Sequence, residues 1–149
     1  MRSTFGHADW REIGGRKIYC RSMWEANFAR YLQFLKERKQ IKDWQHEPHT
    51  FWFEEIKRGV RSYLPDFLVI ENDDRGYWVE VKGFMDPKSL TKIKRFRKYY
   101  PDEILLIIDK KWFAENGKKL HSLIPGWEKA NQFRRPSAEK LTRLFNLEA

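Results

Sequence analysis

Three ionisable residues interrupt two apolar segments near the middle of the chain. Asp66 lies in the first segment, and Glu80 and Lys82 lie two residues apart in the second. Carboxylates are ligands that suit Mg²⁺ and Mn²⁺, and such an ion can polarise a phosphodiester and activate an attacking water. A neighbouring lysine could orient or deprotonate that water, or neutralise charge on the phosphate. The alternative is that the three residues form an ordinary salt-bridge network at the edge of a sheet.

The two segments together have the pattern of a β-hairpin between residues 63 and 84. Two apolar runs flank a polar turn around Asp74, as expected for two strands joined by a short loop. With the turn centred there, positions whose numbers sum to about 148 face each other, give or take two residues. Asp66 then lies opposite Lys82, with Glu80 one step away diagonally. The three side chains are therefore expected to converge at the open end of the hairpin.

The sequence on both sides of this hairpin predicts helices and one further strand. Residues 22–39 carry apolar side chains at helical spacing and predict the first helix. Pro87 stands at a first helical position, and the apolar stripe that follows predicts a second helix ending near Pro101. The continuous apolar run at 103–109 is typical of a strand covered on both faces. A helix crossing between hairpin and run would make the last two strands parallel.

Other segments give weaker patterns. Residues 17–20 predict a short strand, and residues 44–53 predict either one strand or two strands interrupted at Pro48. Beyond Lys110 the apolar residues have no firm periodicity, until residues 137–147 predict a closing helix.

Length and composition favour one domain spanning residues 1–149. The chain has 149 residues, 41% of them hydrophobic and 16% aromatic, which is enough for a single hydrophobic core. We expect a mixed α/β fold, with a central mixed β-sheet flanked by helices. Its α-β-β-β-α-β core would occupy about residues 17–110, followed by a C-terminal extension at residues 111–149.

The charge balance points to a polyanionic partner. There are 30 Lys and Arg residues against 21 Asp and Glu, giving a net charge of +9, and the simplest partner for such an excess is nucleic acid. Residues 87–100 carry six of these cations and no acid. The residues expected to contact DNA phosphates are Lys88, Lys92, Lys94, Arg95 and Lys98. The alternative is a basic helix face that is simply solvated.

A few features of the sequence bear on the cellular location of the protein and on metals other than Mg²⁺ and Mn²⁺. No apolar run approaches the roughly 20 residues of a membrane span, and the first ten residues lack the apolar segment of a signal peptide. The single Cys20 excludes an internal disulfide and fits a reducing, cytoplasmic setting. With one cysteine and no second cluster, zinc is unsupported. His46 and His49 are therefore expected to be solvated or hydrogen-bonded strand residues.

The spacing of the charged motifs resembles that of a known nuclease superfamily. Pro65-Asp66, thirteen intervening residues and then Glu80-Val81-Lys82 resemble the P-D…(D/E)-x-K signature of the restriction-endonuclease-like superfamily. In that family the aspartate opens one hairpin strand and the E-x-K ends the next. The resemblance implies that Asp66 and Glu80 bind Mg²⁺, with Mn²⁺ as a substitute. It also implies that the Val81 carbonyl is a third ligand and that Lys82 is the catalytic lysine.

Glu25 fits the same resemblance, because many members carry a glutamate on the first helix that points at the metals. It shares a helical face with Phe28 and Leu32, so it is directed inward. The resemblance implies that Glu25 is an auxiliary catalytic acid at the metal site. Ser22 to Glu25 is also the S-x-x-E of a capping box, whose glutamate folds back onto the cap backbone. Both interpretations stay open at this point.

Over about residues 17–109, the layout R-S-x-x-E, E-P, P-D and E-V-K-G resembles small phage-type nucleases. These include the endonuclease I type of Holliday-junction resolvase. The resemblance implies a metal-dependent DNA endonuclease, selective for branched DNA, often a homodimer and encoded by a phage in a bacterial host. Two alternatives remain: a nuclease of the same fold acting on linear, single-stranded or sequence-specific DNA, and a non-catalytic DNA-binding module.

Overall fold

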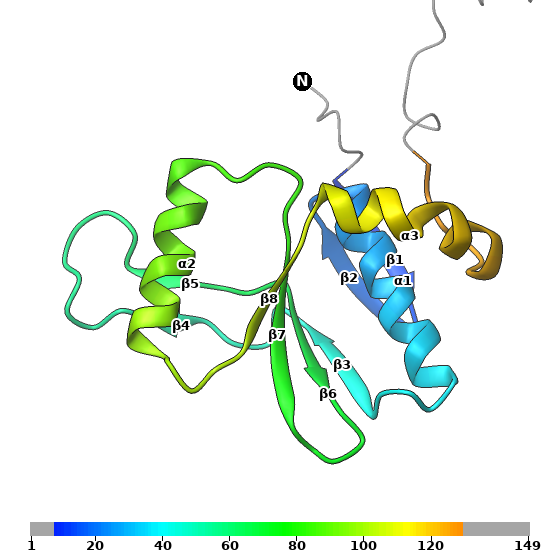
Figure 1. Cartoon of the computed structure of the whole chain (residues 1–149), viewed down its shortest axis with the longest axis horizontal. Coiled ribbons are helices and arrows are strands. Elements are labelled where there is room, and N and C mark those ends of the chain that lie inside the picture. The colour runs from blue at the N-terminus through cyan, green and yellow to red at the C-terminus, as the bar shows by residue number, and fades with distance from the viewer. Residues whose placement is uncertain (1–7, 130–149) are drawn as a thin grey trace, which may run out of the picture.

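A four-stranded sheet, in the order β3-β6-β7-β8, forms the centre of the computed structural model, which describes residues 8–129 (Figure 1). The strands are β1 (Asp9–Ile13), β2 (Arg16–Cys20), β3 (Asp43–His46), β4 (Phe51–Trp52), β5 (Ser62–Tyr63), β6 (Phe67–Ile70), β7 (Gly76–Val81) and β8 (Leu105–Ile108). The helices are α1 (Met23–Glu37), α2 (Pro87–Tyr99) and α3 (Lys110–Leu123). β8 runs parallel to β7 and the other pairs are antiparallel, which confirms a mixed α/β class.

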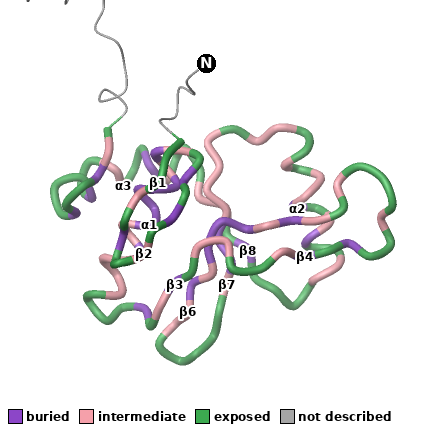
Figure 2. The backbone as a smooth tube through the Cα atoms, turned by 180° about the vertical axis from the view of Figure 1, so that it is seen from behind, coloured by how far each residue is buried: buried purple, intermediate pink, exposed green. Residues whose placement is uncertain are grey.

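Both faces of this sheet are covered, and the side chains of β7 alternate between them. Val79 enters the hydrophobic cluster formed with α1 and α3, which we call the α1 face. Trp78 enters the cluster formed with α2 and the β4-β5 pair, which we call the α2 face. Figure 1 shows α1 and α3 on one side of the sheet and α2 on the other. Figure 2 shows that most of the residues between β6 and β7 are exposed.

Local signals explain where the two predicted helices begin. The Ser22 hydroxyl accepts a hydrogen bond from the Glu25 N–H at 3.1 Å, as a helix N-cap does. Asp86 caps α2 in the same way, accepting from the Ser89 N–H at 2.7 Å, and Pro87 occupies the first turn as predicted. The predicted helices at residues 22–39 and after Pro87 are therefore confirmed within two residues.

The register of the hairpin differs from the expected one by two residues. Phe67 pairs with Val79, so extending the ladder by one position places Asp66 opposite Glu80. The predicted pairing of Asp66 with Lys82 is therefore wrong. The open end of the hairpin still gathers the charged residues, but the two carboxylates now face each other directly.

The loop at the hairpin tip explains this shift. The Glu71 N–H donates to the Arg75 carbonyl at 2.8 Å, and the Asp74 N–H donates to the Glu71 carbonyl at 3.0 Å. Asp74 has φ 70°, the left-handed conformation that closes a three-residue hairpin loop. The turn is therefore centred one residue before Asp74. Moving the centre of a hairpin by one residue changes the partner of every strand residue by two positions.

Two further strand predictions are resolved. Residues 44–53 form two strands on either side of Pro48, and these strands, β3 and β4, belong to different sheets. β8 was expected to be covered on both faces, yet Leu106 is 45% exposed. That expectation is wrong on the α1 face, because β8 is the last strand of the sheet whereas α1 packs over β3 at the other edge. On the α2 face Leu105 is buried as expected.

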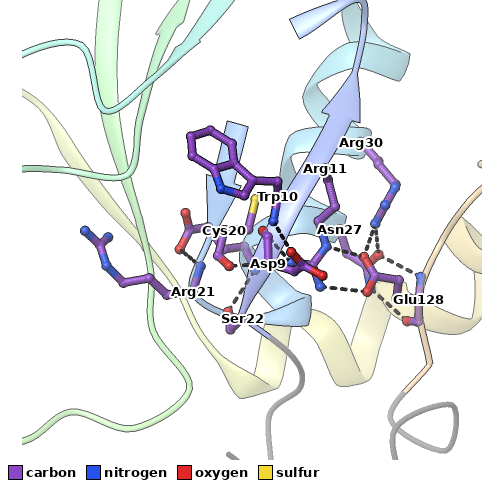
Figure 3. A network of polar contacts seen from close by, with 10 residues as sticks. Asp9, Trp10, Arg11, Cys20, Arg21, Ser22, Asn27, Arg30 and Glu128 are labelled. Carbon is purple, nitrogen blue, oxygen red and sulfur yellow. Dashed lines mark hydrogen bonds and ion pairs between the residues drawn. The ribbon is translucent and has the colours of Figure 1, made fainter. Parts of the chain in front are cut away.

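α3 and the residues after it belong to the core, although their apolar residues have no firm periodicity in the sequence. Phe113 and Leu120 of α3 join the cluster on the α1 face. Glu128 accepts hydrogen bonds from Arg11 at 2.9 Å and from Arg30 at 2.6 Å (Figure 3). Burial raises the pKa of Glu128, but these two guanidiniums outweigh it and hold that pKa below its usual range. Part of the expected C-terminal extension therefore stabilises β1 and α1.

The predicted helix at residues 137–147 lies outside the described residues. Among the helices within residues 8–129, none combines the length and apolar composition needed to cross a membrane.

Candidate functional site

One pocket of about 520 Å³ contains all the residues that the sequence predicted for catalysis and metal binding. It lies where β6 begins and β7 ends, next to the first turn of α1. Its lining includes Glu25, Asp66, Glu80, Val81 and Lys82. The antiparallel pairing of β6 and β7 explains this, because it brings the start of one strand beside the end of the other.

Asp66 is at the centre of the pocket and is 6% exposed. Its Oδ2 accepts a hydrogen bond from the Val81 N–H at 2.7 Å, which fixes the carboxylate across the hairpin. Burial raises the pKa of Asp66 well above its usual range, and the negative charges of Glu80 and Glu25 raise it further. Neighbouring negative charges thus surround a carboxylate whose ionised form is already disfavoured by burial.

Glu80 is held by a residue that the sequence analysis missed. The hydroxyl of Tyr63, in β5, donates a hydrogen bond to Glu80 Oε2 at 2.7 Å. Burial raises the pKa of Glu80, while the Tyr63 hydrogen bond and the charge of Lys82 oppose that effect. Burial and the charge of Glu80 also raise the pKa of Tyr63, so the phenol stays a neutral donor. No sequence motif predicts the role of Tyr63. Its position depends on the pairing of β5 with β4, which lies outside the β6-β7 hairpin.

Glu25 contacts the backbone before α1 with one carboxylate oxygen and a neighbouring side chain with the other. It is 4% exposed, and its Oε1 accepts from the Arg21 N–H at 3.3 Å, one residue before the N-cap. Its Oε2 lies 2.6 Å from Nε2 of His46. The other half of a capping box, a bond to the Ser22 N–H, is replaced by the bond to Arg21. One oxygen therefore holds the backbone before the helix start, and the other contacts His46.

Glu47 is a second residue that the sequence analysis did not assign to the site. Carboxylate oxygens of Glu25, Glu47 and Asp66 all lie within 4.8 Å of one another. The Glu47 N–H donates to the Asp66 carbonyl at 2.8 Å, and the Glu47 side chain pairs with the guanidinium of Arg21. Its φ of 47° is unusual for a residue other than glycine, and such a conformation costs about 1–3 kcal/mol. The E-P dipeptide was the available signal, because the turn before Pro48 places the Glu47 carboxylate near those of Glu25 and Asp66.

The two histidines have different environments. His46 is in β3, and its hydrogen bond to Glu25 agrees with the expectation of a hydrogen-bonded strand residue. His49 is exposed and lies between β3 and β4 rather than in a strand.

The donor atoms in the pocket fit a hard divalent cation. Glu25, Asp66 and Glu80 line the pocket and Glu47 lies beside Glu25 and Asp66, and all four supply carboxylate oxygens, which Mg²⁺ and Mn²⁺ prefer over nitrogen or sulfur donors. Lys82 is half-buried at the same pocket, on the side of Glu80. A divalent cation beside Asp66 would offset the repulsion that raises the pKa values of the acids.

The basic residues of α2 lie in different environments. Lys92 lines the pocket, whereas Lys88, Lys94 and Lys98 are exposed. Arg95 donates a hydrogen bond to the Val60 carbonyl in the loop between β4 and β5. Its guanidinium therefore supports that loop, in addition to any contact with a phosphate.

Comparison with protein-family models found no matching family, and comparison with curated proteins found no matching sequence. The function is therefore inferred from the residues of the pocket and from the chemistry they can perform.

The pKa of Asp66 leads to a prediction about stability in the absence of metal. Because the folded protein binds the Asp66 proton more tightly than the unfolded chain, the free energy of unfolding should fall as pH rises from about 4 toward the folded-state pKa. Asp66→Asn keeps an acceptor for the Val81 N–H but cannot ionise. The variant should therefore gain stability over the parent as pH rises, by about 1.4 kcal/mol per unit of pKa elevation.

Denaturant unfolding of both proteins with a chelator, between about pH 4 and pH 8, measures this difference. Added Mg²⁺ should then stabilise the parent more than the variant. Stability curves that stay parallel across the range would show that Asp66 has an ordinary pKa.

Proposed function

We propose that the chain is a Mg²⁺-dependent DNA endonuclease with a restriction-endonuclease-like core. The observation that carries the proposal is the convergence of Glu25, Asp66, Glu80 and Lys82 in one pocket at the open end of the β6-β7 hairpin. A salt-bridge network, the alternative, would balance its charges. Here the electrostatic effect of neighbouring acids on Asp66 is repulsive, and the closest fixed partner of Asp66 is a backbone N–H.

Each residue has a separate role in the proposed reaction. Asp66 and Glu80, with the Val81 carbonyl, would hold Mg²⁺ at the scissile phosphate, and Tyr63 keeps Glu80 oriented through its hydrogen bond. The cation, when bound, polarises the phosphate and lowers the pKa of a bound water. Lys82 would orient or deprotonate the attacking water, or neutralise charge that builds up on the phosphate. Glu25 would complete the negative field that holds the cation.

The proposed substrate is branched DNA cleaved by a homodimer, and its support is the motif layout over residues 17–109. The net charge of +9 also favours a polyanion. Cleavage assays on a four-way junction, a flap, a duplex and a single strand, with Mg²⁺ or a chelator, test activity and preference together. Cleavage confined to the junction and flap is the expected result. Metal-dependent cleavage of another form would change the substrate, and binding without cleavage of any form would favour the non-catalytic module.

The basic helix α2 gives a prediction about affinity. Lys88 and Lys92 are four residues apart and share a side of the helix that reaches the pocket, whereas Lys94 and Lys98 lie on another side. Replacing Lys88 and Lys92 with alanine should weaken binding to all DNA forms and reduce the slope of log affinity against log salt by about 2. The double variant at Lys94 and Lys98, which removes the same charge, should change the slope less. Equal slopes for the two double variants would contradict the proposed path of the DNA.

Glu25→Gln separates a role at the metal from a role in helix capping. Glutamine keeps an oxygen for the Arg21 N–H and can donate to His46, so the free energy of unfolding should change by less than about 1 kcal/mol. Loss of the negative charge should lower the cleavage rate by about a hundredfold, with partial rescue by raised Mn²⁺. The thermal midpoint and the rate should be measured on the same preparations. A large drop in midpoint with an unchanged rate per folded molecule would make Glu25 only a cap.

A further inference from the structure

A second set of metal-binding atoms lies behind the carboxylates of the pocket. The sulfur of Cys20, a carboxylate oxygen of Glu25 and a ring nitrogen of His46 all lie within 4.8 Å of one another. They come from three separate elements, namely the last residue of β2, the first turn of α1 and the last residue of β3. Figure 3 shows Cys20 beside Arg21 and Ser22, where the chain passes from β2 into α1. The single cysteine had argued against zinc, but it is placed beside the two residues that could complete a site.

The donor types of this set differ from those of the pocket. Thiolate and imidazole select Zn²⁺ and Co²⁺ over Mg²⁺, which requires oxygen ligands. Glu25 belongs to both sets, because it also lies within 4.8 Å of Glu47 and Asp66. One carboxylate is thus shared between an all-oxygen group and a group of sulfur, nitrogen and oxygen.

The spacing of the three donor atoms can be compared with that required by a tetrahedral site. With metal–ligand distances of about 2.0–2.3 Å, ligand atoms are separated by about 3.3–3.8 Å. Nε2 of His46 is 2.6 Å from Oε2 of Glu25, so these two atoms need to separate by roughly 1 Å. Glu47 Oε1, at 4.0 Å from the same nitrogen, or a water from the pocket can provide the fourth ligand.

Charge balance permits a cation at this depth. Cys20 is 0% exposed and the side chain of His46 is 8% exposed, so an ion there must be neutralised by its ligands. A divalent ion with one thiolate, one carboxylate and one neutral imidazole has no net charge. Burial, and to a smaller extent the charge of Glu25, raise the pKa of Cys20 to about 12. The thiol is therefore protonated until a metal displaces its proton.

We propose that Cys20, Glu25 and His46 form a binding site for Zn²⁺ and similar borderline cations, and that occupancy inhibits the Mg²⁺-dependent reaction. Inhibition arises because the Glu25 carboxylate, once bound to this ion, no longer contributes its negative charge to the Mg²⁺ site. Binding at this site is independent of the proposed nuclease activity, whereas the inhibitory consequence rests on that proposed function.

Co²⁺ provides a test of binding that needs no DNA. Full-length protein titrated with Co²⁺ in the absence of Mg²⁺ and oxygen should develop a near-ultraviolet thiolate-to-cobalt absorption band that saturates at one equivalent and is removed by Zn²⁺. Cys20→Ser and Cys20→Ala should both abolish the band, and His46→Gln should weaken Co²⁺ binding at least about tenfold. His49→Gln, at an exposed histidine outside the set, is the matched control and should bind like the parent.

Circular dichroism of each variant establishes that it is folded. Two different replacements of Cys20 keep the test valid if one of the two variants does not fold. No band in the folded parent, or a band that persists in both Cys20 variants, overturns the proposed site.

Zn²⁺ titrations of the cleavage reaction test the inhibitory consequence. Cys20→Ser should retain the parent rate in Mg²⁺ alone and should need at least about tenfold more Zn²⁺ for half-inhibition. Equal inhibition of the parent and Cys20→Ser would contradict this mechanism, because Zn²⁺ would then act at the oxygen ligands. If the parent cleaves no DNA, the proposed nuclease function fails while the Co²⁺ band still decides whether the site exists.

Discussion

Asp66→Asn is expected to lower the rate of Mg²⁺-dependent DNA cleavage by at least about a thousandfold, equivalent to about 4 kcal/mol of transition-state stabilisation. Asp66 is buried opposite Glu80, and its amide analogue keeps the hydrogen bond from the Val81 N–H at 2.7 Å. The fold should therefore persist while a ligand of the cation is lost. DNA binding should change by less than about threefold, because affinity depends mainly on contacts of Lys and Arg with phosphates. Single-turnover cleavage and a binding isotherm on one preparation measure both quantities.

Asp102→Asn is the matched control, since Asp102 is exposed and lies in the turn before β8. Its cleavage rate should equal that of the parent. A cleavage rate in Asp66→Asn close to that of the control would remove Asp66 from the reaction, and a parallel loss of DNA binding would assign it to substrate contact instead.

Lys82→Ala is expected to reduce cleavage by about a hundredfold to a thousandfold, which matches the usual contribution of an acid, base or charge-stabilising group at a phosphoryl centre. Lys82 is half-buried beside Glu80, and its charge lowers the pKa of that carboxylate. Its removal should therefore also raise the pKa of Glu80, and a protonated Glu80 would bind the cation less tightly. Rates measured across Mg²⁺ concentrations separate the two effects, because only the indirect one is corrected by more Mg²⁺.

Lys118→Ala, on the exposed surface of α3, removes the same charge away from the pocket and should leave the rate unchanged. Full recovery of Lys82→Ala at high Mg²⁺ would mean that Lys82 only adjusts metal affinity. Lys82→Arg adds a further comparison, because arginine keeps the charge but cannot give up a proton.

The elements that were predictable from the sequence are those specified by local signals. α1 and α2 each have apolar spacing and a polar N-cap, and the β6-β7 hairpin has a polar turn between two apolar runs. β1 was not predicted, because its five residues are mostly polar and exposed and it depends on pairing with β2. The shift in register came from the left-handed conformation of Asp74, which no motif at the tip announces. α3 was missed because only Phe113 and Leu120 are buried along it.

The candidate site shows the same division. Asp66, Glu80 and Lys82 stand at recognisable spacing in a single hairpin, so their proximity followed from the sequence. Tyr63 reaches the pocket from a strand of another sheet, and Glu47 reaches the carboxylates of Glu25 and Asp66 from the positive-φ turn before Pro48, so both depend on tertiary structure. The grouping of Cys20 with His46 likewise requires β2, α1 and β3 to pack together. The spacing of these residues in the sequence does not predict that packing.

The central claim is that the carboxylates of this pocket bind a divalent cation for phosphodiester hydrolysis. Electron paramagnetic resonance titration of Mn²⁺ into metal-free, full-length protein tests it most directly, because the result does not depend on the correct DNA substrate. The account predicts a Mn²⁺ site that Mg²⁺ displaces, with affinity lowered at least about tenfold in Asp66→Asn and in Glu80→Gln and unchanged in Asp102→Asn. Equal Mn²⁺ binding by the parent and the Asp66→Asn, Glu80→Gln double variant would contradict it.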